Sequence, residues 1–175
     1  PVLIRMIDDS RRGTEDLTLP LVGHFNHCIT YIPSIGKDGI YLDGTATYSA
    51  MDSFPNYDQG ARVLIVKPDG GELRTIPYNG PKVDRIKQKG SLTISPKGEA
   101  ILNYSSDVLG SFSQVIRAVF QNKSVQSKYF ESILYGQIFP GTKVLGTPKF
   151  SDLTELNKPV SFDVRVLLPG FARSN

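Results

Sequence analysis

The most regular pattern along the chain is an alternation of apolar and polar residues close to its C-terminal end. Apolar side chains occupy every second position from Val160 to Leu168, and Ser161, Asp163 and Arg165 stand between them. Successive side chains of a β-strand point to opposite faces of the sheet, so this alternation predicts a strand with one packed face. Shorter runs rich in apolar, β-branched and aromatic residues predict further strands at 2–6, 25–32, 40–43, 62–66, 85–94 and 99–104.

Two stretches in the second half of the chain have the spacing of helices. Ser111-Phe112-Ser113-Gln114 matches a capping box, in which a hydroxyl and an amide side chain satisfy free backbone N–H groups. The apolar residues of this first helix fall on one face: Phe112, Val115, Ile116, Val119 and Phe120. A second helix is expected over about 125–138, ending before Pro140-Gly141. Its apolar residues group in the same way: Tyr129, Phe130, Ile133, Leu134 and Ile138.

The segments between these elements are rich in turn residues. A turn over 33–39 ends in Asp-Gly, which favours the positive φ angles of a hairpin. Longer loops are predicted at 8–20 and 44–60, and residues 76–84, with two prolines and a glycine, predict a linker. We therefore expect an α+β protein, mostly antiparallel β, with domains at 1–80 and 81–175, of which the second is β-rich and carries one or two helices.

Composition and charge narrow the classes of function. Of the 175 residues, 39% are hydrophobic and 21% are charged, as in ordinary globular proteins. No apolar run approaches the roughly 20 residues that a membrane-spanning helix needs. The net charge of +3 combines −3 in residues 1–80 with +6 in residues 81–175. These cations are scattered, and no aromatic residue lies within their one cluster at 82–89, so we expect a solvated basic face and no nucleic-acid partner.

The first residues suggest that the chain is part of a longer protein. Pro1 to Met6 is an apolar segment typical of a strand already under way, without an initiator methionine or a signal peptide. We therefore expect a fragment. The single cysteine, Cys28, excludes a disulfide bond within the chain.

Candidate chemistry is concentrated at 23–31 and 40–46. His27 stands near the start of one predicted strand and Asp43 at the end of the next, so a hairpin would place them side by side. In nucleophilic catalysis such a carboxylate orients the imidazole and stabilises its charged form. A histidine–aspartate pair in a half-buried sheet also serves structure alone, and these residues by themselves leave both roles open.

Neighbouring residues suit this chemistry less well. Cys28 directly follows His27 and should face the other side of the strand, so we interpret it as a small buried apolar residue and not as a nucleophile. His24 suggests a metal site with His27, Cys28 and Asp43, but three residues along a strand again give opposite faces, so we expect no metal and an exposed His24. The aromatic residues of loop 48–57 can wall a cleft or anchor the loop on the sheet, and we favour the anchor.

These segments resemble the second half of a transglutaminase-like core. The resemblance is carried by Phe25-Asn26-His27, by Tyr41-Leu42-Asp43-Gly44-Thr45-Ala46, and by residues 57–66, where a Gln-Gly pair precedes a strand. Gly44 stands where the family usually has proline. The resemblance covers residues 1–80, and residues 81–175 are similar in pattern to a β-rich domain that follows the core in a bacterial subgroup.

The resemblance implies an enzyme of the papain-like thiol class, which acts on amide bonds of a peptide or protein by acyl transfer or hydrolysis and needs no cofactor. His27 would be the catalytic base and Asp43 its orienting partner. The nucleophilic cysteine, which in the family opens a helix, would lie in a missing N-terminal part, a possible partner of this chain. The 175 residues alone should be inactive. The resembling proteins are usually exported, which implies a periplasmic or secreted location in a bacterium.

Two hypotheses of other classes stay open. The domains can form a non-catalytic β-rich module that binds a peptide, a glycan or a partner protein, because a fold is often kept after its chemistry is lost. The basic half can also bind polyanions, for which salt-sensitive retention on heparin would be the sign.

Overall fold

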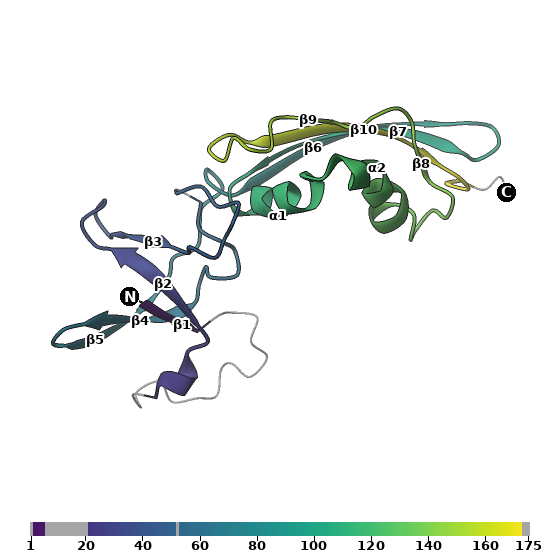
Figure 1. Cartoon of the computed structure of the whole chain (residues 1–175). Coiled ribbons are helices and arrows are strands. Elements are labelled where there is room, and N and C mark those ends of the chain that lie inside the picture. Colours follow the sequence, from purple (N-terminus) through teal and green to yellow (C-terminus); the bar gives the residue numbers. More distant parts are fainter. Residues whose placement is uncertain (1, 6–20, 52, 173–175) are drawn as a thin grey trace. The chain divides into compact units, whose positions relative to one another are not determined.

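A computed structural model describes residues 2–5, 21–51 and 53–172 of the chain. These residues form mostly antiparallel β-sheet with short helices, in agreement with the predicted α+β class. Two compact units follow one another along the chain, Pro1–Asp84 (unit 1) and Arg85–Asn175 (unit 2) (Figure 1). Each has its own sheet and its own hydrophobic core. Among the helices of the described part, none is long and apolar enough to cross a membrane.

Unit 1 is a five-stranded antiparallel sheet with the strand order β3-β2-β1-β4-β5. Its elements are β1 (Val2–Arg5), the short 3-10 helix η1 (Val22–His24), β2 (His27–Ile32), β3 (Ile40–Leu42), β4 (Arg62–Lys67) and β5 (Gly70–Thr75). The first four strands lie where the sequence predicts them. β5 is not predicted, because it begins with two glycines and alternates charged with other residues, which gives no apolar run. Met6 and the loop predicted at 8–20 lie outside the described residues.

The hairpin of β2 and β3 fixes the register of the region that carries the candidate residues. Tyr31 pairs directly with Tyr41, and their ring centres lie 4.8 Å apart. The turn requires Gly39, because its φ is 73° and a side chain there would overlap the ring of Tyr31. The face of the sheet that carries these rings also carries the core of the unit, in which the residues of described burial are Ile29, Ala61, Val63, Ile65 and Ile76.

Residues 76–84 are not the free linker that their prolines and glycine predict. Ile76 is only 2% exposed, and its backbone is hydrogen-bonded to residues 60–61. The amide of Gln59 also donates a 2.9 Å hydrogen bond to the carboxylate of Asp84. The segment therefore packs as part of unit 1, and the chain divides after Asp84.

Unit 2 contains a second antiparallel sheet with the strand order β6-β7-β10-β8, and β9 also pairs with β10. Its strands are β6 (Arg85–Ile94), β7 (Ala100–Leu109), β8 (Lys143–Val144), β9 (Lys149–Phe150) and β10 (Val160–Leu168). Its helical segments are α1 (Ser111–Phe120), the 3-10 helix η2 (Lys123–Val125), α2 (Gln126–Lys128) and the π-helix η3 (Tyr129–Leu134). The three strands that the sequence predicts here are present, and β7 is longer than expected.

The alternation in β10 produces the packed face that it predicts. Its five inward side chains, from Val160 to Leu168, are at most 6% exposed. The helices cover this face of the sheet, with α1 against β7 and β10 (Figure 1). The rings of Phe120 and Phe130 stack 5.2 Å apart, and both contact Phe162 of β10. Burial of each such ring stabilises the fold by about 1.5–3 kcal/mol.

Helix α1 differs from the prediction at its start and on its faces. The N-cap position, which the capping box assigns to Ser111, is taken by Gly110, whose φ is 75° and whose carbonyl accepts a 2.7 Å hydrogen bond from the hydroxyl of Ser113. The predicted apolar face is also only partly covered: Phe112 and Val115 are 40% and 57% exposed, whereas Arg117 is fully buried. The helix is rotated so that Arg117 reaches backbone carbonyls in the loop before β10.

The second predicted helix is shorter than expected and changes type along its length. The helical residues end at Leu134, and Ile138 beyond them is 70% exposed. The backbone of Gly136 lies against the carbonyl of Glu131, where a side chain would have no space. The chain therefore leaves the helix before the position that the apolar spacing suggests.

Candidate functional site

Strand alternation brings His27 and Asp43 to the same face of unit 1. His27 opens β2, four residues before Tyr31, and Asp43 follows β3, two residues after Tyr41. The two tyrosines are direct partners in the sheet, and side chains on one face recur at every second residue. Both candidate residues therefore project to the side that carries the core, as a diagonal pair across the hairpin.

The imidazole and the carboxylate lie within reach of a hydrogen bond. Nε2 of His27 is 3.2 Å from Oδ1 of Asp43, and the two side chains are 17% and 0% exposed. The separation is that of a hydrogen bond, although the ring N–H is not aligned with Oδ1 as it is in a strong one. Nε2 is the nitrogen that faces the carboxylate, which leaves Nδ1 for another group.

Asp43 is held in place by the turn that it starts. Its Oδ1 accepts hydrogen bonds from the backbone N–H (2.9 Å) and the hydroxyl (2.7 Å) of Thr45. Burial, the largest single influence, opposes the charged carboxylate, but the two hydrogen bonds from Thr45 and the nearby His27 outweigh it and lower the pKa of Asp43 below its ordinary value. The carboxylate is therefore ionised at neutral pH and fixed in orientation.

The long loop after β3 adds a tyrosine to the site. The hydroxyl of Tyr57 donates a long hydrogen bond of 3.4 Å to Oδ2 of Asp43. Burial, followed by the charges of Asp43 and Asp58, raises the pKa of Tyr57 to about 12, so the hydroxyl keeps its proton. Phe54 of the same loop packs against Tyr41, with ring centres 6.1 Å apart. The predicted anchoring of the loop by its aromatic residues is confirmed for Phe54.

Asp58 brings a second carboxylate to the same place. It is fully buried, and one ligand atom each from His27, Asp43 and Asp58 lie within 4.8 Å of one another. An imidazole and two carboxylates are suitable ligands for Zn²⁺ or another divalent cation. The set differs from the one considered on the sequence, since neither His24 nor Cys28 belongs to it.

Cys28 and His24 are not placed as predicted. Cys28 is exposed, so its interpretation as a buried apolar residue is wrong. It lies on the face of β2 opposite to His27 and Ile29, as alternation requires, but alternation alone does not tell which face is covered. His24 lies in η1 rather than on a strand, and it is partly buried rather than exposed.

Two hollows lie near the β2–β3 hairpin of unit 1, and of the candidate pair only Asp43 lines one of them. The smaller, of about 250 Å³, is lined by Tyr41, Asp43 and loop 44–54. The larger, of about 820 Å³, shares Tyr41 and part of that loop and extends to Arg74 and the hairpin turn.

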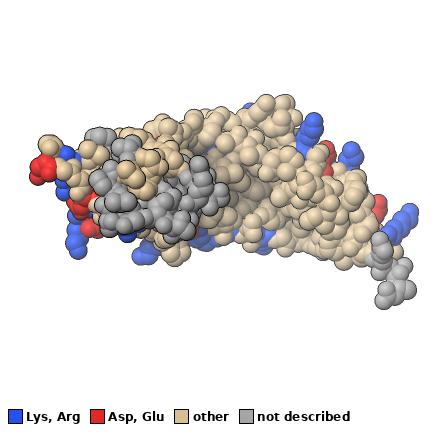
Figure 2. Space-filling model, turned by 90° about the horizontal axis from the view of Figure 1, so that it is seen from below, with Lys and Arg blue, Asp and Glu red and all other residues tan. Residues whose placement is uncertain are grey.

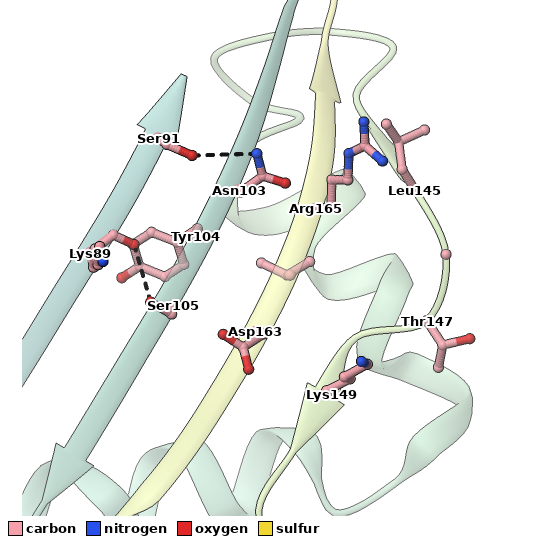
Figure 3. A pocket seen from close by; sticks show the side chains of 12 residues that line it. Lys89, Ser91, Asn103, Tyr104, Ser105, Leu145, Thr147, Lys149, Asp163 and Arg165 are labelled. Carbon is pink, nitrogen blue, oxygen red and sulfur yellow. Dashed lines mark hydrogen bonds between the residues drawn. The ribbon is translucent and has the colours of Figure 1, made fainter. Parts of the chain in front are cut away.

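Unit 2 has a hollow on the outer face of its sheet, opposite the helices. It measures about 600 Å³ and is lined by side chains of β6, β7 and β10 and by the segment that leads into β9 (Figure 3). Three cations, Lys89, Lys149 and Arg165, lie around one carboxylate, Asp163, among hydroxyl and amide groups. Such a lining suits a polar or anionic ligand rather than acid–base catalysis.

Three residues of the site in unit 1 lie in segments that the sequence analysis names, but it assigns them no contact with Asp43: Thr45, Tyr57 and Asp58. Thr45 leaves a usable signal, since Asp-Gly-Thr is typical of a turn in which the aspartate accepts hydrogen bonds two residues on. Tyr57 and Asp58 leave no such signal. They follow Asp43 by some fifteen residues of irregular loop, and only the path of that loop returns them to the carboxylate.

No protein-family model matches the sequence, and no curated protein or solved structure matches it either. The transglutaminase-like resemblance therefore depends on the segments around His27, Asp43 and Gln59, and the site on its own geometry.

Proposed function

We propose that His27 and Asp43 are the general base and its orienting carboxylate in a cysteine-dependent site of transglutaminase-like type, which acts on amide bonds of peptides or proteins. The observation that carries this proposal is the 3.2 Å separation of Nε2 and Oδ1. The orienting carboxylate must be fixed and the base must be reachable. Asp43 is buried and held by Thr45, while the imidazole of His27 remains 17% exposed.

In this proposal Nδ1 of His27 is the atom that accepts a proton, because Nε2 faces Asp43. It takes the proton from a thiol supplied by a part of the protein outside residues 1–175, and the thiolate forms a C–S bond with the amide carbonyl carbon. The imidazolium returns its proton to the leaving amine as the C–N bond breaks. Water or a second amine then attacks the thioester carbon, the C–S bond breaks, and a proton passes from the nucleophile through Nδ1 to the leaving sulfur, which completes hydrolysis or acyl transfer.

The 175-residue chain should have no activity of this kind by itself. Its one cysteine, Cys28, is exposed on the face of β2 away from His27, so its thiol cannot pass a proton to the imidazole of His27. Hydrolysis of amide substrates by the chain alone, abolished by Cys28→Ser, would contradict this assignment of roles.

The orienting role of Asp43 can be tested on the chain as it stands. We expect ¹⁵N NMR shifts of neutral His27 to report the tautomer with the proton on Nε2, because that proton faces the carboxylate. Asp43→Asn should reduce this preference, whereas the tautomer of His24, read from the same spectrum, should not change. A wild-type His27 with its proton on Nδ1 would overturn the proposal.

The catalytic role requires a chain extended at its N-terminus. We expect the extension to contain a cysteine that opens a helix, and His27→Ala to slow its alkylation by iodoacetamide at neutral pH by about 10²-fold. His24→Ala is the matched control and should leave the rate unchanged. An extension without such a cysteine would favour the alternative proposal, a non-catalytic module that binds a peptide, a glycan or a partner protein.

A divalent-cation site is a second candidate, favoured by the grouping of His27, Asp43 and Asp58. Added Zn²⁺ should then shift the ring signals of His27 at one equivalent, and Asp58→Asn should weaken the binding. Because Thr45 already donates two hydrogen bonds to Oδ1 of Asp43, the cation would bind Oδ2 and displace the long 3.4 Å bond from Tyr57. Unchanged His27 signals at excess Zn²⁺ would exclude this candidate without affecting the first.

A further inference from the structure

The helices of unit 2 leave one long strand uncovered. β6 is ten residues long, forms the edge of the sheet and is exposed at every residue. Because α1 lies against β7 and β10, even the apolar side chains of β6 remain open: Ile86, Leu92 and Ile94 are 46%, 40% and 49% exposed. The outer edge of such a strand presents unpaired N–H and C=O groups, which can accept another strand.

The two faces of β6 differ in chemistry. Ile86 pairs with the buried Val108 and therefore projects to the helix side of the sheet. Lys87 and Lys89 project to the opposite face, where Lys89 is seen at the outer hollow (Figure 3). A strand added beside β6 would meet apolar groups on one face and cations on the other.

An apolar groove continues the helix side of β6. It has a volume of about 270 Å³ and lies between β6 and the helices. Its lining includes Ile86, Phe112, Val115 and Leu134, of which the last three are 40%, 57% and 43% exposed. Figure 2 shows this helix-bearing side of unit 2 as a largely uncharged surface with charged side chains toward its rim. Apolar side chains of a partner strand could therefore be buried here.

We propose that β6 binds an extended segment of a partner protein in which acidic and apolar residues alternate, by adding it as a strand to the edge of the sheet. The backbone of the segment would hydrogen-bond to the outer edge of β6. Its apolar side chains would enter the groove beside Phe112 and Val115, and its carboxylates would face Lys87 and Lys89. This proposal is independent of the chemistry proposed for unit 1.

Charge selects this occupant over a second copy of the chain. Residues 85–175 carry a net charge of +6, with 12 Lys and Arg against 6 Asp and Glu. Two copies of β6 side by side would gather their arginines and lysines on one face without carboxylates from either strand. Lysines on a free edge oppose such self-pairing, so a strand that pairs there must bring the opposite charge.

The binding test uses the whole 175-residue chain and a capped, fluorescent peptide in which Glu and Val alternate over the length of β6. We expect saturable binding by fluorescence anisotropy, with NMR shifts of backbone amides confined to β6 and α1. A Lys-Val peptide of the same length should bind at least about ten-fold more weakly, because cross-strand charges then repel. Equal binding of the two peptides would overturn the proposal.

Charge reversal on the protein is the reciprocal test. Lys87→Glu with Lys89→Glu should weaken binding of the Glu-Val peptide by about ten-fold and favour the Lys-Val peptide. The matched control, Lys143→Glu with Lys149→Glu, makes the same change in charge on β8 and β9 and should retain the wild-type preference. If both double variants changed the preference between the two peptides to the same extent, net charge alone would explain the binding. That result would contradict a site at β6.

The strand-addition mode has its own test, which needs no protein variant. N-methylation of alternate amides removes the donors from one edge of the peptide. Of the two Glu-Val peptides methylated on opposite edges, we expect one to lose binding and the other to keep it. Loss of binding in both peptides or in neither would contradict strand addition.

A dimer in sedimentation velocity that the peptide does not dissociate would show that a second copy of the chain occupies the edge of β6, and would overturn the proposal.

Discussion

At the scale of the residue, the site of unit 1 depends on a carboxylate that is both buried and ionised. Burial alone would favour protonation of Asp43, and two hydrogen bonds from Thr45 reverse that preference. The free-energy cost of burying the ionised carboxylate of Asp43 is thus offset by two hydrogen-bond donors of Thr45, only two residues along the chain. The orientation of the carboxylate toward His27 follows from the same turn.

Thr45→Val should therefore destabilise the protein in a pH-dependent way. The variant keeps the backbone N–H but loses the 2.7 Å bond from the hydroxyl, and we expect a loss of about 1.5 kcal/mol at pH 7. Because the pKa of Asp43 is lower in the folded state, its stabilising contribution is present above the unfolded value of about 4 and is lost as the pH falls through the folded pKa. The difference from wild type should accordingly shrink toward pH 3.

Urea unfolding at a series of pH values measures this effect. Thr47→Val is the matched control, since Thr47 is also exposed and its hydroxyl gives no bond to Asp43. A difference for Thr45→Val that stays constant from pH 7 to pH 3 would show that the bond does not depend on the charge of Asp43.

At the scale of the element, α1 is fixed by an arginine and not by the apolar face that its sequence predicts. The guanidinium of Arg117 donates to the backbone carbonyls of Leu153 (2.6 Å), Glu155 (2.9 Å) and Lys158 (2.7 Å). Burial lowers the pKa of Arg117, yet a guanidinium stays charged in proteins. One side chain thus joins α1 to the loop that leads into β10.

Arg117→Met should destabilise unit 2 by about 3 kcal/mol, because three backbone carbonyls lose a charged donor. Arg117→Lys should restore only part of this loss, since one ammonium cannot span the three carbonyls. Lys123→Met, a change of the same type at an exposed position, is the control. Urea unfolding with an unchanged m-value checks the result, and equal stabilities of the two methionine variants would contradict the assigned role.

At the scale of the whole molecule, the two units have separate cores. One core gathers residues between Ile29 and Ile76, and the other gathers residues between Ala100 and Leu168. Among the described residues, every pair of hydrogen-bonded strands joins two strands of the same unit. Each described strand of unit 2 therefore pairs only with other strands of unit 2.

Residues 85–175 expressed alone should consequently fold. We expect cooperative urea unfolding, and amide NMR signals of the core residues that coincide with those in the whole chain. A matched segment that ends at residue 150 lacks β10 and should not fold, because β10 pairs with β7, β8 and β9. A non-cooperative transition for 85–175 would show that unit 2 needs the rest of the chain.

The elements that the sequence predicts correctly are those with local signals. The strict alternation in β10 records one buried face, and the Asp-Gly turn before Ile40 sets the β2–β3 hairpin and with it the meeting of His27 and Asp43. The short strands β8 and β9 and the glycine-rich β5 carry no such signal, because two-residue pairs and charged edges form only where a partner strand is already in place.

The sequence by itself thus determined the longer strands, the β2–β3 hairpin and the pairing of an imidazole with a carboxylate. The tertiary structure decided which faces are covered, since Cys28 is exposed, Arg117 is buried, and Phe112 and Val115 remain open beside β6. The path of the irregular loop after β3 also brings the hydroxyl of Tyr57 within 3.4 Å of Asp43. Periodicity depends on backbone geometry that each residue carries with it, whereas burial depends on what the rest of the chain places opposite.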